Sequence, residues 1–194
     1  MRLFVAITLP ADVHKRIVRV MEELKPLSRA PRWVRPEGLH LTVKFLGEVK
    51  EPQLAPIVAE LKEIRALRPI EFRFRGLGSF PKHDRPRVIW AGIDVNKELT
   101  DLAESMESRL EPLGFPREER EFSPHITLAR INSRERLDNL ARAMAGFASY
   151  DFGTMQAGEF QLSQSTLKPS GAEYASLGTF HFASSGADTE DRRK

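Results

Sequence analysis

The strongest constraint on the fold of this chain is a repeated order of strands and helices. The apolar start of the chain reads as a strand, and a helix, a strand, a second helix and a third strand follow it. The same order begins again in the middle of the chain, so that the strand at His125 lies 85 residues after the strand at His40. Two copies of a β-α-β-α-β unit predict two pseudo-symmetric lobes related by an approximate two-fold axis. The last two expected strands, 158–165 and 172–182, then close the second half.

The two equivalent strands carry the same polar pair. In "HLTVKFL", strand alternation places His40, Thr42 and Lys44 on one face and the apolar residues, up to the phenylalanine, on the other. In "HITLARI", His125 and Thr127 share one face in the same way. Equivalent residues face each other across a two-fold axis, so we expect both H-x-T motifs to line one central cleft.

Two histidines and two threonines in this arrangement suit a displacement at phosphorus. Near pH 7 a neutral imidazole accepts a proton and an imidazolium donates one. In an in-line attack on a phosphodiester, one imidazole deprotonates the nucleophile and the other protonates the leaving oxygen on the far side of phosphorus. The threonine hydroxyls donate to the non-bridging oxygens. Each motif therefore supplies one proton-transfer group and one hydrogen-bond donor.

The sequence offers little for other chemistries. It contains no cysteine, which removes disulfides, thiolate catalysis and the common structural zinc sites. Neither motif has an aspartate nearby as a third ligand, and no H-E-x-x-H or G-x-S-x-G run occurs. We therefore expect no metal and no cofactor. The run Gly76–Gly78 reads as a turn, and His14, His83 and His181 read as structural or solvated residues.

Composition and length set the general class. The chain has 194 residues and a net charge of +3, and 21 of its 30 basic residues are arginine, which suits phosphate and bases. A GC-rich genome would give the same bias, so composition permits nucleic acid without demonstrating it. No apolar run approaches about 18 residues, and the start becomes charged too soon for a secretory signal. We expect a cytoplasmic, monomeric protein without membrane association, with one domain over 1–183 and a disordered tail at 184–194.

Four stretches carry a resemblance to a known family. "RLFVAITLP", "RWVRPEGLHLT", "SPHITLAR" and "STLKPSGAEY" resemble the RNA 2',3'-cyclic phosphodiesterase group, also called the 2'-5' RNA ligase family, of the two-histidine (2H) phosphoesterase superfamily. The resemblance covers about Arg2 to Phe182. It implies an α+β, bilobal fold with two pseudo-symmetric lobes, each with an antiparallel sheet and two helices, around a central cleft that carries both H-x-T motifs. It also implies metal-independent hydrolysis of a terminal 2',3'-cyclic phosphate on RNA, which leaves a 2'-phosphate. It also implies RNA ends or nucleoside 2',3'-cyclic phosphates as partners.

The resemblance also implies a role for each site residue. His40 matches the proton donor to the leaving oxygen, and His125 matches the base that activates water. Thr42 and Thr127 match the hydroxyls that hold the phosphate, and Arg130 matches a basic residue at the site. Simple alternation sends Arg130 to the face opposite His125, so its reach into the cleft requires a strand end or a bulge.

Alternatives to hydrolysis stay open at this point. The same cleft could bind nucleotides or RNA ends without turnover, or it could join RNA halves through a 2'-5' bond. Aromatic side chains of the chain could stack on a base. We expect Phe4 and Trp90 to pack in the core instead, whereas Trp33 and Tyr174 are open candidates for stacking.

Overall fold

Strands and helices follow one another along the chain largely in the predicted order. The computed structural model describes residues 1–64, 68–81, 86–132, 137–168 and 171–182. His83 and the expected tail 184–194 lie outside these ranges. The elements, in chain order, are β1 (Arg2–Thr8), α1 (Ala11–Leu24), β2 (Pro31–Trp33), β3 (His40–Glu48), α2 (Leu54–Lys62), β4 (Ile70–Phe80), β5 (Val88–Ile93), α3 (Lys97–Leu110), β6 (His125–Ile131), α4 (Asp138–Gly146), β7 (Asp151–Ala157), β8 (Glu159–Lys168) and β9 (Gly171–His181).

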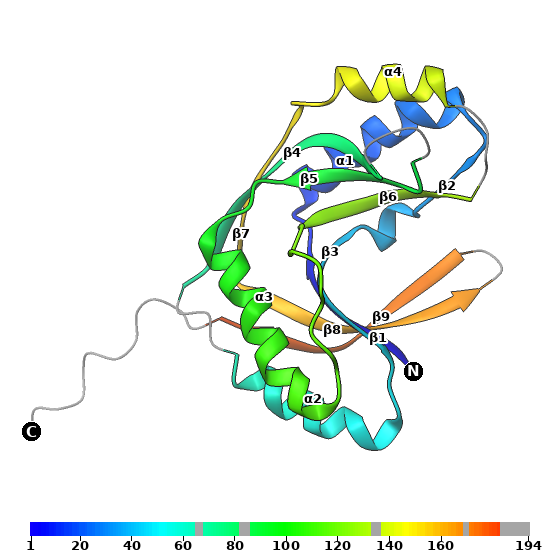
Figure 1. Cartoon of the computed structure of the whole chain (residues 1–194). Helices are drawn as coiled ribbons and strands as arrows, with labels where there is room; N and C mark the ends of the chain where they lie inside the picture. The colour runs from blue at the N-terminus through cyan, green and yellow to red at the C-terminus, as the bar shows by residue number, and fades with distance from the viewer. Residues whose placement is uncertain (65–67, 82–85, 133–136, 169–170, 183–194) are drawn as a thin grey trace, which may run out of the picture.

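The described strands form one antiparallel sheet. Its order is β7-β4-β5-β6-β3-β1-β8-β9, and β2 pairs with β6. The two strands that carry the H-x-T motifs, β3 and β6, lie at the centre (Figure 1). They meet through the antiparallel pair Leu41–Ile126. The topology therefore brings residues from distant parts of the sequence to one place.

The two halves of the sheet have the same construction on either side of this central pair. The order β3-β1-β8-β9 on one side corresponds to β6-β5-β4-β7 on the other, which confirms the predicted pseudo-symmetric α+β fold. The third strand of each repeat crosses into the other lobe, since β4 pairs with β5 and β8 pairs with β1. The expectation that β8 and β9 close the second half is therefore wrong. β8 instead covers the outer edge of β1, whose backbone groups would otherwise lack partners.

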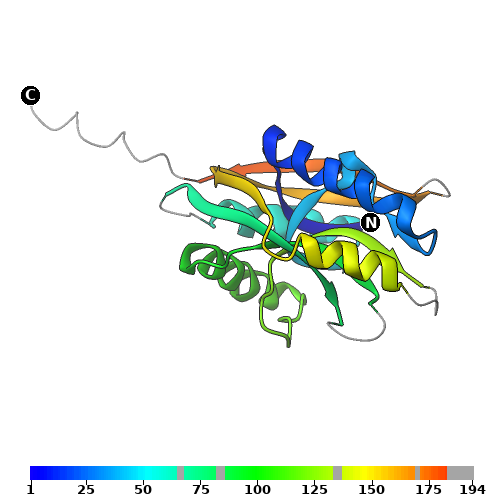
Figure 2. The same cartoon turned by 90° about the horizontal axis from the view of Figure 1, so that it is seen from above.

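The helices pack in two pairs outside the sheet halves. α1 contacts α4 and β7, whereas α2 contacts α3 and β9. Figure 2 shows α1 and α4 side by side when the molecule is seen from above. No helix in the described ranges has the length and apolar character needed to cross a membrane. The predicted apolar stripe of α1 is buried, namely Val13, Ile17, Val20, Met21 and Leu24.

Candidate active site

A bulge in β3 reverses the alternation of its side chains. Val5 pairs with Lys44 and Ala6 with Thr42, so Val43 is an extra residue without a partner on β1. Beyond this bulge, Phe45 turns to the face of His40. Its side chain is 63% exposed, and its ring centroid lies 6.4 Å from that of Phe4, which stacks on His40.

The same bulge sends Lys44 to the opposite face, and the prediction that Lys44 shares the His40 face is wrong. Lys44 is only 5% exposed. Its ammonium donates to Glu107 Oε2 on α3 at 2.5 Å and to the carbonyl oxygen of Pro116 at 3.0 Å. A buried ammonium needs such partners because burial removes its hydration. Lys44 therefore joins β3 to α3 and to the loop before β6.

We expect Glu107→Ala to lower the free energy of unfolding by about 3 kcal/mol, because it leaves a buried ammonium with one carbonyl partner. Urea unfolding at pH 7 measures this change. Asp101→Ala is the matched control, because it breaks the exposed Lys97–Asp101 pair on the same helix and should change stability little. An equal loss in the two variants would contradict a stabilising role for the Lys44–Glu107 pair.

An equivalent bulge occurs in β6. Ile89 pairs with Ala129 and Trp90 with Thr127, which leaves Leu128 as the extra residue. The reversal beyond Leu128 turns the exposed Arg130 to the face of His125, while Ala129 and Ile131 on either side of it are buried. The bulge that Arg130 was expected to require is therefore present. Arg130 and Phe45 occupy equivalent positions of the two repeats, since each is the fifth residue after its histidine.

Both H-x-T motifs lie on one side of the central strands. Counting one residue outward from the Leu41–Ile126 pair sets His40 across from Thr127 and Thr42 across from His125. We call the sheet surface that carries these four side chains the histidine face. The other surface of the two strands is apolar apart from Lys44 and belongs to the core.

The two imidazoles are held in the same way. His40 Nδ1 donates to the carbonyl oxygen of Gly38 at 2.7 Å, and His125 Nδ1 donates to that of Ser123 at 2.8 Å. A carbonyl oxygen only accepts hydrogen bonds, so the hydrogen of each neutral ring lies on Nδ1. The Nε2 atom of each ring is then the one that is free to accept or donate a proton at the histidine face.

The surroundings of His40 are strongly aromatic. Phe4 stacks on its ring with centroids 4.7 Å apart, and Tyr174 contacts it edge-on at 5.1 Å. Burial among these rings lowers the pKa of His40, and the hydrogen bond to Gly38 acts in the opposite direction with a smaller effect. Phe4 is buried as expected, but it is buried against the imidazole. The open question about Tyr174 is answered in part, because its ring lines the histidine face.

His125 also has aromatic neighbours, on the other lobe. Phe80 contacts its ring edge-on at 5.1 Å, and the centroid of Trp90 lies 6.5 Å away. Trp90 is half-buried and lines the histidine face, whereas Trp33 packs against the core. The expectation that Trp90 packs in the core is therefore wrong, and Trp33, which was an open candidate for stacking, packs against the core.

Two glycines make room for these rings. A Cβ on Gly38 would lie 2.8 Å from the ring of Tyr174, and a Cβ on Gly78 would collide with the indole of Trp90, its cross-strand neighbour. The run Gly76–Gly78 is therefore not a turn, as the sequence suggested, but an irregular part of β4 that admits an aromatic side chain.

Two further histidines and a surface hollow belong to elements other than β3 and β6. His14 Nε2 contacts the carbonyl oxygen of Pro36 at 2.8 Å, and the exposed His181 lies 3.1 Å from Glu159. No group of three His, Cys, Asp or Glu side chains in the described ranges is arranged to hold a metal ion. A shallow hollow of about 590 Å³ includes Phe72, Asn96 and other residues of β4, β7 and the start of α3, but none from β3 or β6.

Known proteins share both the sequence and the fold. A curated relative from Archaeoglobus fulgidus, named RNA 2',3'-cyclic phosphodiesterase, is 37% identical over 180 residues, covering 93% of this chain and 99% of the relative. A relative of the same name from Methanocaldococcus jannaschii is 35% identical, covering 90% and 96%. A crystal structure from Thermus thermophilus superposes with a TM-score of 0.81 at 32% identity, covering 96% of this chain and 100% of the other. E. coli LigT complexed with 3'-AMP gives a TM-score of 0.76 at 27% identity, covering 93% and 97%.

One family model matches the chain twice. The model described as LigT like Phosphoesterase covers residues 7–90 and again residues 93–174. Each matched segment contains one H-x-T motif near its centre, His40 in the first and His125 in the second. The duplication seen in the sheet is therefore also a duplication of the family's sequence pattern, and this chain belongs to the LigT-like phosphoesterase family.

Proposed function

We propose that the protein hydrolyses the terminal 2',3'-cyclic phosphate of RNA to a 2'-phosphate by acid-base catalysis between two histidines. The observation that carries the proposal is the pair of imidazoles on adjacent central strands, each anchored through Nδ1 with its Nε2 free. The curated relatives named RNA 2',3'-cyclic phosphodiesterase support the choice of substrate. Phosphate binding alone would not require two free imidazole nitrogens, since lysine or arginine would serve as well.

The proposed reaction has one proton entering and one leaving the protein. His125 Nε2 accepts a proton from water as the water oxygen forms a bond to phosphorus. The bond between phosphorus and the 3' oxygen breaks, and His40 Nε2 donates a proton to that oxygen. The products are a 3' hydroxyl and a 2'-phosphate, and one proton passes between the two histidines before the next turnover.

The neighbouring side chains stabilise the charge that develops on phosphate. We assign the hydroxyls of Thr42 and Thr127 as donors to the non-bridging oxygens, and the Arg130 guanidinium as the balancing positive charge. Thr42 belongs to one repeat, and Thr127 and Arg130 belong to the other, so the substrate phosphate would sit between the two motifs. The cleft expected from the sequence is, in this proposal, the histidine face.

The lowered pKa of His40 has to be reconciled with its role as the acid. In the free protein, burial among Phe4 and Tyr174 favours the neutral ring. An anionic phosphate bound next to the imidazole favours the protonated ring, because opposite charges within about 4–6 Å raise the pKa of a histidine. We therefore propose that substrate binding itself charges His40. The reverse reaction, joining of RNA ends through a 2'-5' bond, would use the same groups with exchanged roles.

We expect the reaction to proceed in EDTA, since each motif supplies its own proton-transfer group and hydrogen-bond donor. The test incubates the protein with a nucleoside 2',3'-cyclic phosphate and an excess of chelator, and identifies the product by its phosphate position. A 2'-phosphate at an unchanged rate is the expected result. Loss of turnover in EDTA and its return with a divalent ion would contradict the metal-free mechanism. The monomeric state and the cytoplasmic location stay predictions.

A further inference from the structure

Two arginines lie directly opposite each other at one end of the histidine face. β2 pairs with β6 in the register Pro31–Ile131, Arg32–Arg130 and Trp33–Ala129. Residues directly opposite in an antiparallel pair point to the same side of the sheet. Pro31, Ala129 and Ile131 are buried, while both arginines are exposed. Arg32 therefore points to the histidine face together with Arg130.

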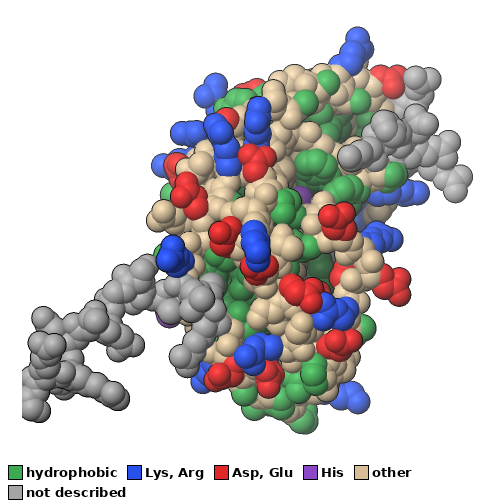
Figure 3. All heavy atoms as spheres, turned by 60° about the vertical axis from the view of Figure 1, so that its left-hand side comes forward, with side chains coloured by type: hydrophobic (Ala, Val, Ile, Leu, Met, Phe, Trp, Pro, Cys, Tyr) green, Lys and Arg blue, Asp and Glu red, His purple; other side chains and the backbone are tan. Residues whose placement is uncertain are grey.

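The arginine pair is distinctive because the two guanidinium groups lie directly opposite each other and neither has a carboxylate partner among the described residues. Like charges directly opposite each other destabilise a sheet. Arg109, in contrast, pairs with Glu60, and on the face shown in Figure 3 basic and acidic side chains are interspersed. Two adjacent guanidinium groups without a counter-charge need an anion to offset their repulsion.

Arg130 also connects this pair to the aromatic side of the face. Burial raises the pKa of the Tyr174 phenol, and the positive charges of Arg130 and Arg2 oppose that rise. The charge of Arg130 thus acts on a side chain of β9, in the other lobe. Tyr174 in turn contacts His40, so the arginine pair continues the surface on which the reacting phosphate would be held.

We propose that Arg32, directly across from Arg130, binds an internucleotide phosphate of the RNA chain that precedes the cyclic end, while Arg130 balances the charge of the reacting phosphate. This inference rests on the proposed function. Arg130 is the fifth residue after His125 on β6, and Arg32 lies across from it on β2. A mononucleotide supplies only the reacting phosphate, whereas an RNA strand supplies a second phosphate for Arg32. Planar guanidinium forks suit two oxygens of such a group.

The substitution Arg32→Gln should impair the reaction on an RNA chain but not the reaction on a single nucleotide. We expect kcat/KM for a tetranucleotide with a 2',3'-cyclic end to fall about tenfold, as the loss of a charge-assisted hydrogen bond predicts, with kcat nearly unchanged. Turnover of a nucleoside 2',3'-cyclic phosphate should stay the same. The slope of log affinity against log salt for the tetranucleotide should fall by about 0.7. Arg32→Lys should restore part of the affinity but not the two-point contact.

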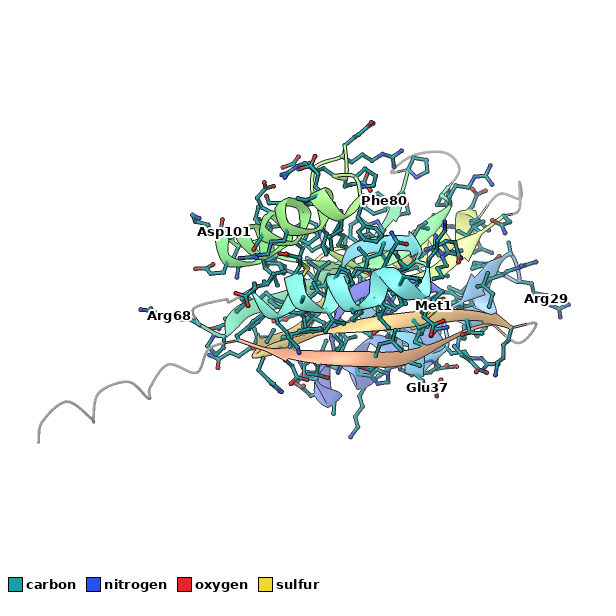
Figure 4. All side chains as sticks on the ribbon, turned by 90° about the horizontal axis from the view of Figure 1, so that it is seen from below. Met1, Arg29, Glu37, Arg68, Phe80 and Asp101 are labelled. Carbon is teal, nitrogen blue, oxygen red and sulfur yellow. The ribbon has the colours of Figure 1, made fainter. Side chains whose placement is uncertain are left out.

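Arg29→Gln is the matched control. It removes the same charge three residues earlier, from a side chain that projects away from the protein body (Figure 4). This variant should behave like the wild type on both substrates. Thermal unfolding at low ionic strength adds a measurement without substrate: Arg32→Gln should unfold at the same or a higher temperature than the wild type, because it relieves repulsion.

Several results would overturn the subsite. One is an equal loss on the two substrates, another is no loss on either, and a third is a lower unfolding temperature, which would make Arg32 a structural residue. Failure of the proposed function gives a different result, since the wild type would then hydrolyse neither substrate. In that case anisotropy titration with a labelled RNA tetramer lacking a terminal phosphate tests the subsite alone: weaker binding by Arg32→Gln than by Arg29→Gln supports it, and equal binding overturns it.

Discussion

His40→Ala and His125→Ala are each expected to lower kcat on a nucleoside 2',3'-cyclic phosphate by about 10²-fold or more. General acid-base groups contribute about 10²–10⁴-fold, and the aromatic side chains that pack on these rings, Phe4, Tyr174 and Phe80, cannot replace either imidazole as a proton-transfer group near pH 7. The double variant should lose much less than the product of the two single losses, because residues that act as one unit are not additive. Initial rates over a range of substrate concentrations give kcat and KM separately.

The control for these variants is His181→Ala. His181 is an exposed histidine beside Glu159, away from the histidine face, and its loss should leave turnover unchanged. Unfolding of each variant in urea checks that the fold is intact, which matters most for His40 because Phe4 stacks on it. Near-normal turnover of either single variant would remove that histidine from the mechanism. A wild type that binds the substrate without turning it over would favour the binding-only alternative.

Strand alternation predicted the local arrangement of each motif, because the period of two holds over the first residues of both strands. His40 and Thr42 share a face, as do His125 and Thr127, and the order of elements between them was also correct. The 85-residue offset predicted that the two strands are equivalent. The pairing of Leu41 with Ile126 then brings them together, and this long-range contact was expected only because two repeats imply an axis.

Strand alternation predicts the wrong face for the residues that follow a β-bulge, because the bulge adds one residue to the strand. Nothing in "HLTVKFL" marks Val43 as a bulge, so Lys44 and Phe45 were assigned to the wrong faces. The burial of Lys44 is supported by Glu107, which lies 63 residues away and has no local signal. Arg130 was assigned to the site by resemblance alone, and the bulge at Leu128 supplies the physical reason that the pattern lacked.

The sequence also failed to predict the short strand β2, the weakly patterned strand β7 and the pairing of β8 with a strand of the other lobe. β2 has three residues and lies in a segment rich in proline and arginine, which reads as a connection. β7 contains Gly153 at a positive φ, and its only fully buried large residue is Phe152, so its alternation is weak. The pairing of β8 with β1 cannot be read from the sequence, because it depends on which edge of the folded sheet is unpaired. The aromatic lining of the histidine face was missed for a similar reason, since an apolar ring that packs on an imidazole looks like a core residue.

Substrates with different leaving groups should separate the roles of the two histidines. On a nucleoside 2',3'-cyclic phosphate, kcat/KM should follow a bell-shaped pH profile, because one histidine must be neutral while the other is protonated. If His40 is the acid, kcat/KM should fall on the alkaline side as His40 of the free protein loses its proton. Because the pKa of His40 is lowered, this fall should occur below pH 6.5, the ordinary pKa of histidine. The same limb in kcat should lie at higher pH, because bound phosphate raises the pKa of His40.

A phosphodiester that releases nitrophenolate needs no acid, because its leaving oxygen is already a stable anion. On this substrate we expect His40→Ala to recover most of its roughly 10²-fold loss and the alkaline limb of the wild-type profile to disappear. His125→Ala should stay impaired, because water still needs a base to attack phosphorus. Recovery in His125→Ala instead would exchange the two roles and make the low pKa of His40 the property of a base. Loss of activity in both variants on both substrates would contradict a role of His40 that is limited to protonating the leaving oxygen.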